Sequence, residues 1–157
     1  MPTIPVEIGK GYMEMQIKVV VDRKRINPDT KVPEVKGVCH VLAGERELIH
    51  EYFISGPWGK GALPFGKYSL KWVQPKIEEA FKLCGFGWFG YLEPQFDTDR
   101  SELGIHPDGG EYIGTLGCVG LKFKTNDFNK KFYNFLMEGL KLGDIEVEVI
   151  DASKKAE

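Results

Sequence analysis

Residues 37–55 read GVCHVLAGERELIHEYFIS and decide the fold class. Two apolar runs, 37–42 and 47–55, flank the glycine-containing segment 43–46, which is the pattern of a β-hairpin. The upstream run 13–22, MEMQIKVVVD, alternates in polarity and then becomes continuously apolar. A strand has this pattern when first one face and then both faces are covered. These runs predict a chain rich in β-structure.

Turn-forming and charged segments separate the predicted strands. Residues 23–36 carry several charges, two prolines and the turn signal at 27–29, Asn-Pro-Asp, so they are expected to form a connecting loop. Residues 56–66 are rich in glycine and proline, which predicts successive turns. Residues 67–73 alternate in polarity and predict a further strand.

Two segments have the pattern of a helix. Residues 75–85, PKIEEAFKLCG, begin with proline and end with glycine, which predicts a short helix. Residues 126–143 follow Thr125, a favourable N-cap, and predict a longer helix that ends at a glycine. Its expected buried stripe, with spacings of three and four, consists of Phe128, Phe132, Phe135, Leu136 and Leu140. The alternating residues 144–150 predict a final strand.

Length and composition indicate one domain. A chain of 157 residues can bury a core of its own, so 1–157 is expected to form a single domain with an irregular lead-in at 1–11 and a frayed tail at 151–157. The net charge of −2, from 21 basic and 23 acidic residues, favours neither nucleic acid nor an anionic membrane as a partner. No apolar run approaches the ~20 residues of a membrane span, and the N-terminal residues lack the apolar centre of a secretory signal.

The three cysteines also limit the possible chemistry. Cys39, Cys84 and Cys118 cannot all pair within one chain, so at least one thiol is free or bonded outside it. A disulfide between Cys39 and Cys84 is one possibility that the sequence leaves open. No C-x-x-C spacing occurs, which counts against a structural zinc site, and we expect neither a metal nor a cofactor.

Residues 103–121, LGIHPDGGEYIGTLGCVGL, contain the candidate catalytic pair His106 and Cys118. A thiol becomes a nucleophile when its proton is removed, and imidazole is the usual partner. The glycines between the two residues allow backbone N–H groups to approach a developing oxyanion. The alternative is structural, since an isolated cysteine in an apolar run is often a small core residue.

Other candidate residues each have two interpretations. Residues 86–96, FGWFGYLEPQF, form either an aromatic wall of a cleft, in which Trp88 and Tyr91 contact substrate, or the packing of an irregular loop. Asp108 and Glu111 either pair with a cationic substrate group or are two solvated carboxylates. His40 and His50 lie within predicted strands and are expected to be partly buried strand residues.

The order of motifs resembles the catalytic domain of the L,D-transpeptidases over about residues 37–150. The matching features are a proline–glycine turn at 64–66 before a strand, Gly-Ile-His at 104–106, and Thr-x-Gly-Cys-Val at 115–119. Two positions differ from the common motif of that family. Leu116 replaces a second histidine, and Gly120 replaces the usual arginine or asparagine. A divergent branch, which includes exported effector enzymes, also lacks the second histidine and is more similar.

The resemblance implies a mainly β fold, a β-sandwich of mixed sheets with one long and one short helix. It also implies chemistry on peptidoglycan stem peptides, in which Cys118 attacks a peptide carbonyl, releases D-alanine and forms a thioester. His106 would act as base, and a backbone carbonyl at Pro107 would orient its ring. The N–H groups of Gly117 and Cys118 would form the oxyanion hole.

Further expectations follow from the same resemblance. Thr115 and Leu116 would contact the stem peptide, and the protein would act in the cell envelope or after export, although the chain shows no export signal. Water as the acceptor gives an L,D-carboxypeptidase and an amine gives a transpeptidase; the sequence leaves the acceptor and the oligomeric state open.

Two alternatives compete with the enzyme. One is a binding module for cell-wall peptides or a partner protein that kept the fold and lost the activity. The other is a metal site formed by His40, His50, His106 and Cys118.

Overall fold

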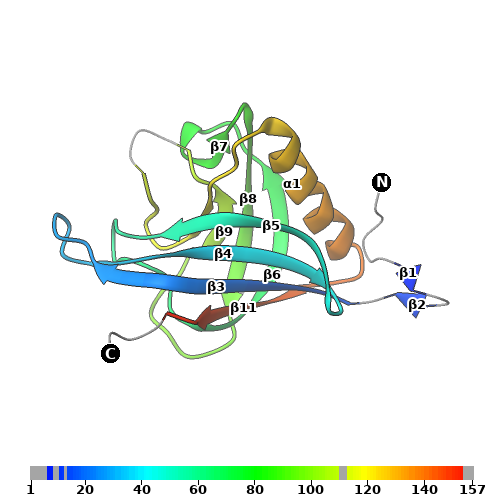
Figure 1. Cartoon of the computed structure of the whole chain (residues 1–157), viewed down its shortest axis with the longest axis horizontal. Coiled ribbons are helices and arrows are strands. Elements are labelled where there is room, and N and C mark those ends of the chain that lie inside the picture. The colour runs from blue at the N-terminus through cyan, green and yellow to red at the C-terminus, as the bar shows by residue number, and fades with distance from the viewer. Residues whose placement is uncertain (1–6, 9–10, 13, 110–112, 154–157) are drawn as a thin grey trace.

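The computed structural model describes residues 7–8, 11–12, 14–109 and 113–153, which form a mainly β protein (Figure 1). A small two-stranded sheet pairs β1 (Glu7–Ile8) with β2 (Gly11–Tyr12), within the segment expected to be an irregular lead-in. The remaining strands belong to one large sheet: β3 (Met15–Ile26), β4 (Pro33–Ala43), β5 (Arg46–Ser55), β6 (Gly66–Pro75), β7 (Lys82–Leu83), β8 (Phe86–Pro94), β9 (Gly104–Pro107), β10 (Val119–Leu121) and β11 (Ile145–Asp151).

The large sheet closes into an eight-stranded barrel. Its order is β6-β11-β3-β4-β5-β10-β9-β8, and antiparallel pairing of β6 with β8 joins the two ends. β7 is an extra strand that pairs with β8 alone. The barrel is mixed, because β11 runs parallel to β3 and β10 runs parallel to β9. The expected β-sandwich is therefore wrong, while the mainly β class is confirmed.

The first predicted strand and the hairpin are confirmed, but the loop between them is much shorter than expected. In β3, burial alternates from Met15 to Val21, so every second side chain enters the core. Beyond a bulge after Val21, β3 and β4 continue to pair as far as Ile26 and Pro33. This extension is mostly exposed on the β3 side, so its charged residues do not disturb the core. The predicted loop 23–36 is therefore wrong over most of its length.

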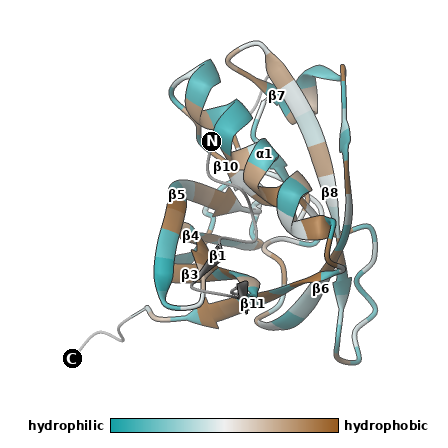
Figure 2. Ribbon diagram, turned by 90° about the vertical axis from the view of Figure 1, so that its right-hand side faces the viewer, coloured by the Kyte–Doolittle hydropathy of each residue, from teal (hydrophilic) through white to brown (hydrophobic). Residues whose placement is uncertain are grey.

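The long helix α1 (Asn126–Leu140) is confirmed and contacts β6 and β8. The Thr125 hydroxyl accepts a hydrogen bond from the Phe128 N–H, as expected of an N-cap. Teal and brown segments alternate along α1 in Figure 2, as in a helix with one buried face. The predicted stripe is wrong at Phe128, which is 50% exposed. The fully buried residue of that turn is Asn129.

The predicted short helix at 75–85 is wrong. β6 continues to Pro75, and the segment then forms only a single 3-10 turn, η1 (Glu79–Phe81), which buries none of its residues. The chain next enters β7 and turns into β8. Residues 86–94, considered as an irregular loop, form the regular strand β8. The barrel needs β8 to close against β6, and this long-range pairing overrides the local helical pattern.

The C-terminal part of the described chain pairs with the barrel. The final strand is confirmed as β11, which extends to Asp151, and the Ala152 N–H donates to the Val21 carbonyl, so the described part of the tail is paired with β3. Residues 154–157 lie outside the described residues.

Cys39, Cys84 and Cys118 are all free thiols, which excludes the disulfide that the sequence left open. Over the residues that the structure describes, no helix is both long and apolar enough to cross a bilayer.

Candidate functional site

The parallel pair β9–β10 brings the two predicted catalytic residues to one face of the barrel wall. His106 pairs in register with Gly120, while Ile105 pairs with Val119 in the core. Because side chains alternate along a strand, Cys118 lies on the same face as Gly120 and hence as His106. Both side chains line one cavity of about 1010 Å³. The structure therefore places the predicted nucleophile and base in the same cavity.

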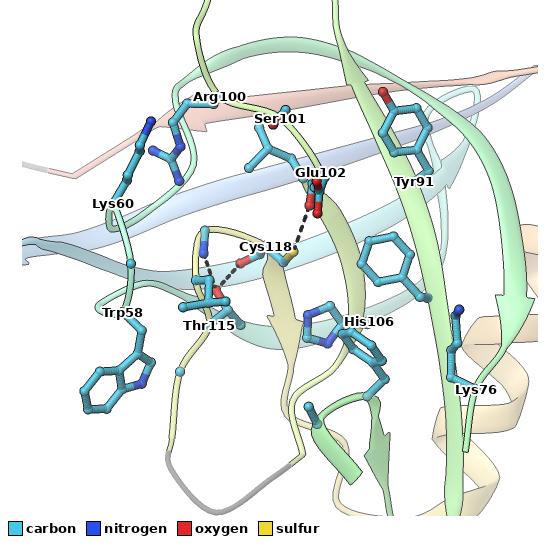
Figure 3. A pocket seen from close by; sticks show the side chains of 18 of the residues that line it. Trp58, Lys60, Lys76, Tyr91, Arg100, Ser101, Glu102, His106, Thr115 and Cys118 are labelled. Atoms are coloured by element: carbon cyan, nitrogen blue, oxygen red, sulfur yellow. Dashed lines mark hydrogen bonds between the residues drawn. The ribbon is translucent and has the colours of Figure 1, made fainter. Parts of the chain in front are cut away.

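The cavity has an aromatic wall and a charged rim (Figure 3). Its aromatic residues are Trp58, Trp72, Phe81, Phe89 and Tyr91. Its charged residues are Lys60, Lys76, Asp99, Arg100 and Glu102. In Figure 3, Lys76 and Tyr91 lie on one side of the catalytic pair, and Trp58, Lys60 and Arg100 lie on the other.

The His106 ring is fixed by a backbone hydrogen bond and by aromatic neighbours. Its Nδ1 atom lies 2.7 Å from the carbonyl oxygen of Pro107, the contact that the resemblance implied. Since a carbonyl oxygen only accepts, Nδ1 carries the hydrogen and Nε2 is left as an acceptor in the neutral ring. Phe89 stacks on the ring at a centroid distance of 5.7 Å, and Phe81 meets it edge-on at 4.8 Å.

Burial keeps the imidazole neutral. The His106 side chain is 4% exposed, and this burial lowers its pKa, although the hydrogen bond to Pro107 and the charge of Asp108 oppose the shift. A pKa below the ordinary value leaves the ring unprotonated at neutral pH. His106 is therefore in the form that can accept a proton.

The Cys118 thiol is half-buried and protonated at rest. Burial raises its pKa to about 11, while a backbone hydrogen bond from Gly104 and the positive charge of Arg100 act in the opposite direction. Its Sγ also lies 3.9 Å from the carbonyl oxygen of Glu102, to which the thiol donates a long hydrogen bond. The resting pair is thus a thiol beside a neutral imidazole, unlike the preformed thiolates of many reactive cysteines.

Thr115 holds the loop that presents Cys118. Its hydroxyl donates to the Cys118 carbonyl over 2.7 Å and accepts from the N–H groups of Gly117 and Gly56, each at 3.2 Å. The Gly117 N–H is therefore engaged, and its predicted role in the oxyanion hole is corrected. The Cys118 N–H remains the candidate donor. Thr115 lines the cavity but is only 6% exposed, so it positions the loop.

Asp108 fits neither interpretation considered from the sequence. Its side chain is 2% exposed and forms an ion pair with Lys122 at 3.0 Å. It also accepts a hydrogen bond from the Gly114 N–H at 3.1 Å. Asp108 is therefore neither a solvated carboxylate nor a group open to substrate, and it anchors the loop after β9. Glu111 lies outside the described residues.

The predicted substrate contacts divide into two groups. Tyr91 and Leu116 line the cavity, and Leu116 is 72% exposed at its rim. Trp88 is fully buried in the core and does not line the cavity, so its predicted contact with substrate is wrong. Successive side chains of β8 point to opposite faces of the sheet, which explains the difference. Trp88 points into the core, whereas Phe89 and Tyr91 line the cavity.

Sequence reasoning missed several residues of the site. Trp58 lies far from residues 103–121 along the chain, whereas Arg100 lies just before them, and no local pattern distinguished either residue. Phe89 was within the aromatic stretch, and recognition of 86–94 as a strand would have separated it from Trp88.

The alternative metal site is not formed. His40 and His50 each hydrogen-bond a carboxylate oxygen of Glu47, and neither lines the cavity of His106 and Cys118. In the described portion of the chain, no cluster of three or more histidine, cysteine, aspartate or glutamate side chains could hold a metal ion.

A scan against protein-family models and a search of curated proteins gave no match to this sequence. The likeness to L,D-transpeptidases therefore depends on the motif residues quoted above.

Proposed function

We propose that this protein is a cysteine acyl-transfer enzyme that acts on peptidoglycan stem peptides, as an L,D-transpeptidase or an L,D-carboxypeptidase. One observation carries the proposal: Cys118 and a neutral His106, whose Nδ1 is held by the Pro107 carbonyl, line the same cavity. The substrate class and a location in the cell envelope come from the motif resemblance.

The first half of the reaction forms a thioester. Nε2 of His106 takes the thiol proton while Sγ of Cys118 attacks the carbonyl carbon of the third stem residue. The resulting imidazolium then gives its proton to the leaving amine as the carbon–nitrogen bond breaks, and D-alanine departs. In the second half, water or an amine attacks the thioester with His106 as base and returns the thiol.

The pKa shifts determine how the thiol is activated. Burial raises the pKa of Cys118 and lowers that of His106, so a thiolate–imidazolium pair is disfavoured before substrate binds. Proton transfer then accompanies attack, as with a serine nucleophile. General base assistance of this kind typically contributes about 10²–10⁴-fold in rate.

The cavity suits a short peptide. A volume of about 1010 Å³ is at the upper end of the range found for small-molecule sites. Aromatic side chains on one wall offer apolar contact, and the charged rim offers partners for the carboxylates and amines of a stem peptide.

A second candidate function is a non-catalytic binding module. The thiol pKa of about 11 and the engaged N–H of Gly117 favour it, because both weaken a resting nucleophilic site. Such a protein would bind stem peptides in the same cavity without forming a thioester.

The test combines D-alanine release with mass spectrometry of the intact protein. With a tetrapeptide stem, the wild type is expected to release D-alanine and to carry an acyl adduct on Cys118. Cys118→Ala and His106→Gln are expected to release none, whereas Cys84→Ala, which removes an exposed thiol outside the cavity, keeps full activity. Peptide binding without adduct or release would establish the binding module instead, and turnover by Cys118→Ala would remove the assigned nucleophile.

A further inference from the structure

Arg100 presents a guanidinium beside the catalytic loop. It lies between β8 and β9, where its Nη1 donates to the Ala62 carbonyl at 3.1 Å and its Nη2 donates to the Gly61 carbonyl at 2.8 Å. These two bonds hold the planar group against the turn-rich segment before β6. The side chain is half-buried and lines the same cavity as Cys118.

Gly117 provides the space that this guanidinium occupies. A Cβ atom at position 117 would lie 2.1 Å from Nη2 of Arg100, which no side chain could tolerate without displacing it. Since Gly117 directly precedes Cys118, the guanidinium lies beside the residue that is next to the proposed nucleophile. The absence of a side chain here gives Arg100 its access to the site.

The charge of Arg100 is not neutralised by the described part of the protein. Lys60, on the same side of the cavity, pairs with Asp99 at 3.9 Å. No described carboxylate forms an ion pair with Arg100, although Glu102 lines the same cavity. A guanidinium has five N–H donors, and two are used by the Gly61 and Ala62 carbonyls. Within the described residues three donors are left for a ligand.

We propose that Arg100 binds the terminal carboxylate of the acyl donor, and so selects peptides that are cut one residue from their C-terminus. This inference deepens the proposed function and rests on it. A guanidinium recognises a carboxylate through paired N–H···O bonds as well as charge. One residue spans about 3.3–3.6 Å, so a carboxylate held beside Gly117 belongs to the residue next to the bond that Cys118 attacks. Arg100 is then a specificity residue for the leaving group.

A binding experiment tests the subsite without requiring turnover. The rate of Cys118 alkylation by iodoacetamide at pH 9 is measured with N-acetyl-D-alanine or with N-acetyl-D-alaninamide, which lacks the carboxylate. In the wild type the acid is expected to protect Cys118 at concentrations at least tenfold lower than the amide. Arg100→Met is expected to abolish this difference. Equal protection by acid and amide in the wild type, or an unchanged preference in Arg100→Met, overturns the proposal.

The control and the second variant guard against a general loss of structure. Arg46→Met removes an arginine from the distant β4–β5 hairpin and is expected to keep the preference for the acid. If Arg100→Met fails to fold, Arg100→Lys is tested instead, because it keeps the charge but loses the paired N–H groups of the guanidinium. It is expected to reduce the preference for the acid over the amide at least threefold. An unchanged preference in Arg100→Lys contradicts recognition by paired N–H···O bonds.

Kinetics separate this proposal from the proposed function. With a stem tetrapeptide, Arg100→Met is expected to lower kcat/KM at least tenfold, mainly through KM, and to leave the slower reaction of the C-terminal amide within twofold. An equal loss for both peptides would mean that Arg100 acts only through Cys118, which overturns the subsite. If no stem peptide reacts at all, the proposed function fails, while the protection experiment still decides whether Arg100 binds carboxylates.

Discussion

Trp88 donates its indole N–H to Oδ1 of Asn129 over 2.7 Å, and both residues are fully buried. Asn129 also donates from Nδ2 to the carbonyl oxygens of Leu83 and Phe86, at 2.7 Å and 2.9 Å. One amide thereby joins helix α1 to strand β8 and to the β7–β8 turn. Since β8 also pairs with β9 and presents Phe89 to His106, this contact supports the strand that forms one wall of the candidate site.

Asn129→Ala is expected to destabilise the protein by about 3 kcal/mol or more, because it leaves the buried Trp88 N–H and two carbonyl oxygens without their partner. Urea unfolding followed by circular dichroism measures the change. Asn134→Ala, at an exposed position of the same helix, is the control and is expected to change the stability by less than about 0.5 kcal/mol. A similar, small effect for both variants would contradict the role of Asn129.

The strands could be predicted where burial follows a local period. The alternation of Met15 to Val21 and of residues 144–150 reflects one covered face, and both strands were found. The barrel itself could not be predicted. Its closure depends on the pairing of β6 with β8, across a segment with a helical pattern, and on the pairing of β3 with β11, which lie far apart in sequence. The segment 75–85 has a helical pattern, yet it forms only the 3-10 turn Glu79–Phe81, and Ile77 is 87% exposed.

That His106 and Cys118 line one cavity could be anticipated, because the two residues lie close in sequence and their side chains have the chemistry of a base and a nucleophile. Most polar contacts around them depend on tertiary structure. The bond from the Gly117 N–H to the Thr115 hydroxyl spans only two residues and is a local turn contact. Nothing local indicates that the same hydroxyl accepts from the Gly56 N–H, or that Lys122 pairs with Asp108. Arg100 lies close to His106 in sequence, but nothing local indicates that the carbonyl oxygens of Gly61 and Ala62 hold its guanidinium at the cavity.

The free energy of unfolding is expected to decrease as the pH is lowered below about 6.5, the ordinary pKa of histidine, and His106 is one cause. Burial lowers the pKa of His106 in the folded state, so the unfolded chain binds a proton in this range that the folded chain does not. Stability therefore rises with pH in this window, by up to about 1.4 kcal/mol per pH unit for one proton. Urea unfolding between pH 5 and 7 is expected to show a smaller slope for His106→Gln than for wild type. Equal slopes would contradict a lowered pKa.

Alkylation of Cys118 is expected to be slow at neutral pH and to accelerate about tenfold per pH unit up to pH 10. Only the thiolate reacts, and burial raises the thiol pKa to about 11. Peptide mapping after iodoacetamide treatment measures the rate at this residue. A plateau reached below pH 8 would show a preformed thiolate and would contradict base-assisted attack. Cys39, which is fully buried, is expected to remain unmodified in the folded protein.

Gly117→Ala is expected to reduce D-alanine release more than tenfold, because the added Cβ collides with the guanidinium of Arg100. Gly143→Ala is a matched control. The two glycines have similar φ values, 136° and 129°, but nothing lies within 4 Å of a Cβ at position 143. Both variants carry backbone strain of about 1–3 kcal/mol, so their melting temperatures fall, but only Gly117→Ala is expected to lose activity. Equal activities would contradict the importance of the contact with Arg100.

Gly120→Asn is expected to destabilise the protein by about 2 kcal/mol or more and to give no gain in activity, although it restores a residue type common in the motif. A Cβ at position 120 would lie 2.7 Å from Cγ2 of Thr115 and 3.0 Å from Cβ of Asp108. These two residues hold the loop between His106 and Cys118, so the larger side chain must displace one of them. Gly120→Ala is expected to show a smaller loss, and urea unfolding ranks the two. Wild-type stability in Gly120→Asn would mean that the glycine at this position has no steric cause. The position could then take the polar side chain of the common L,D-transpeptidase motif.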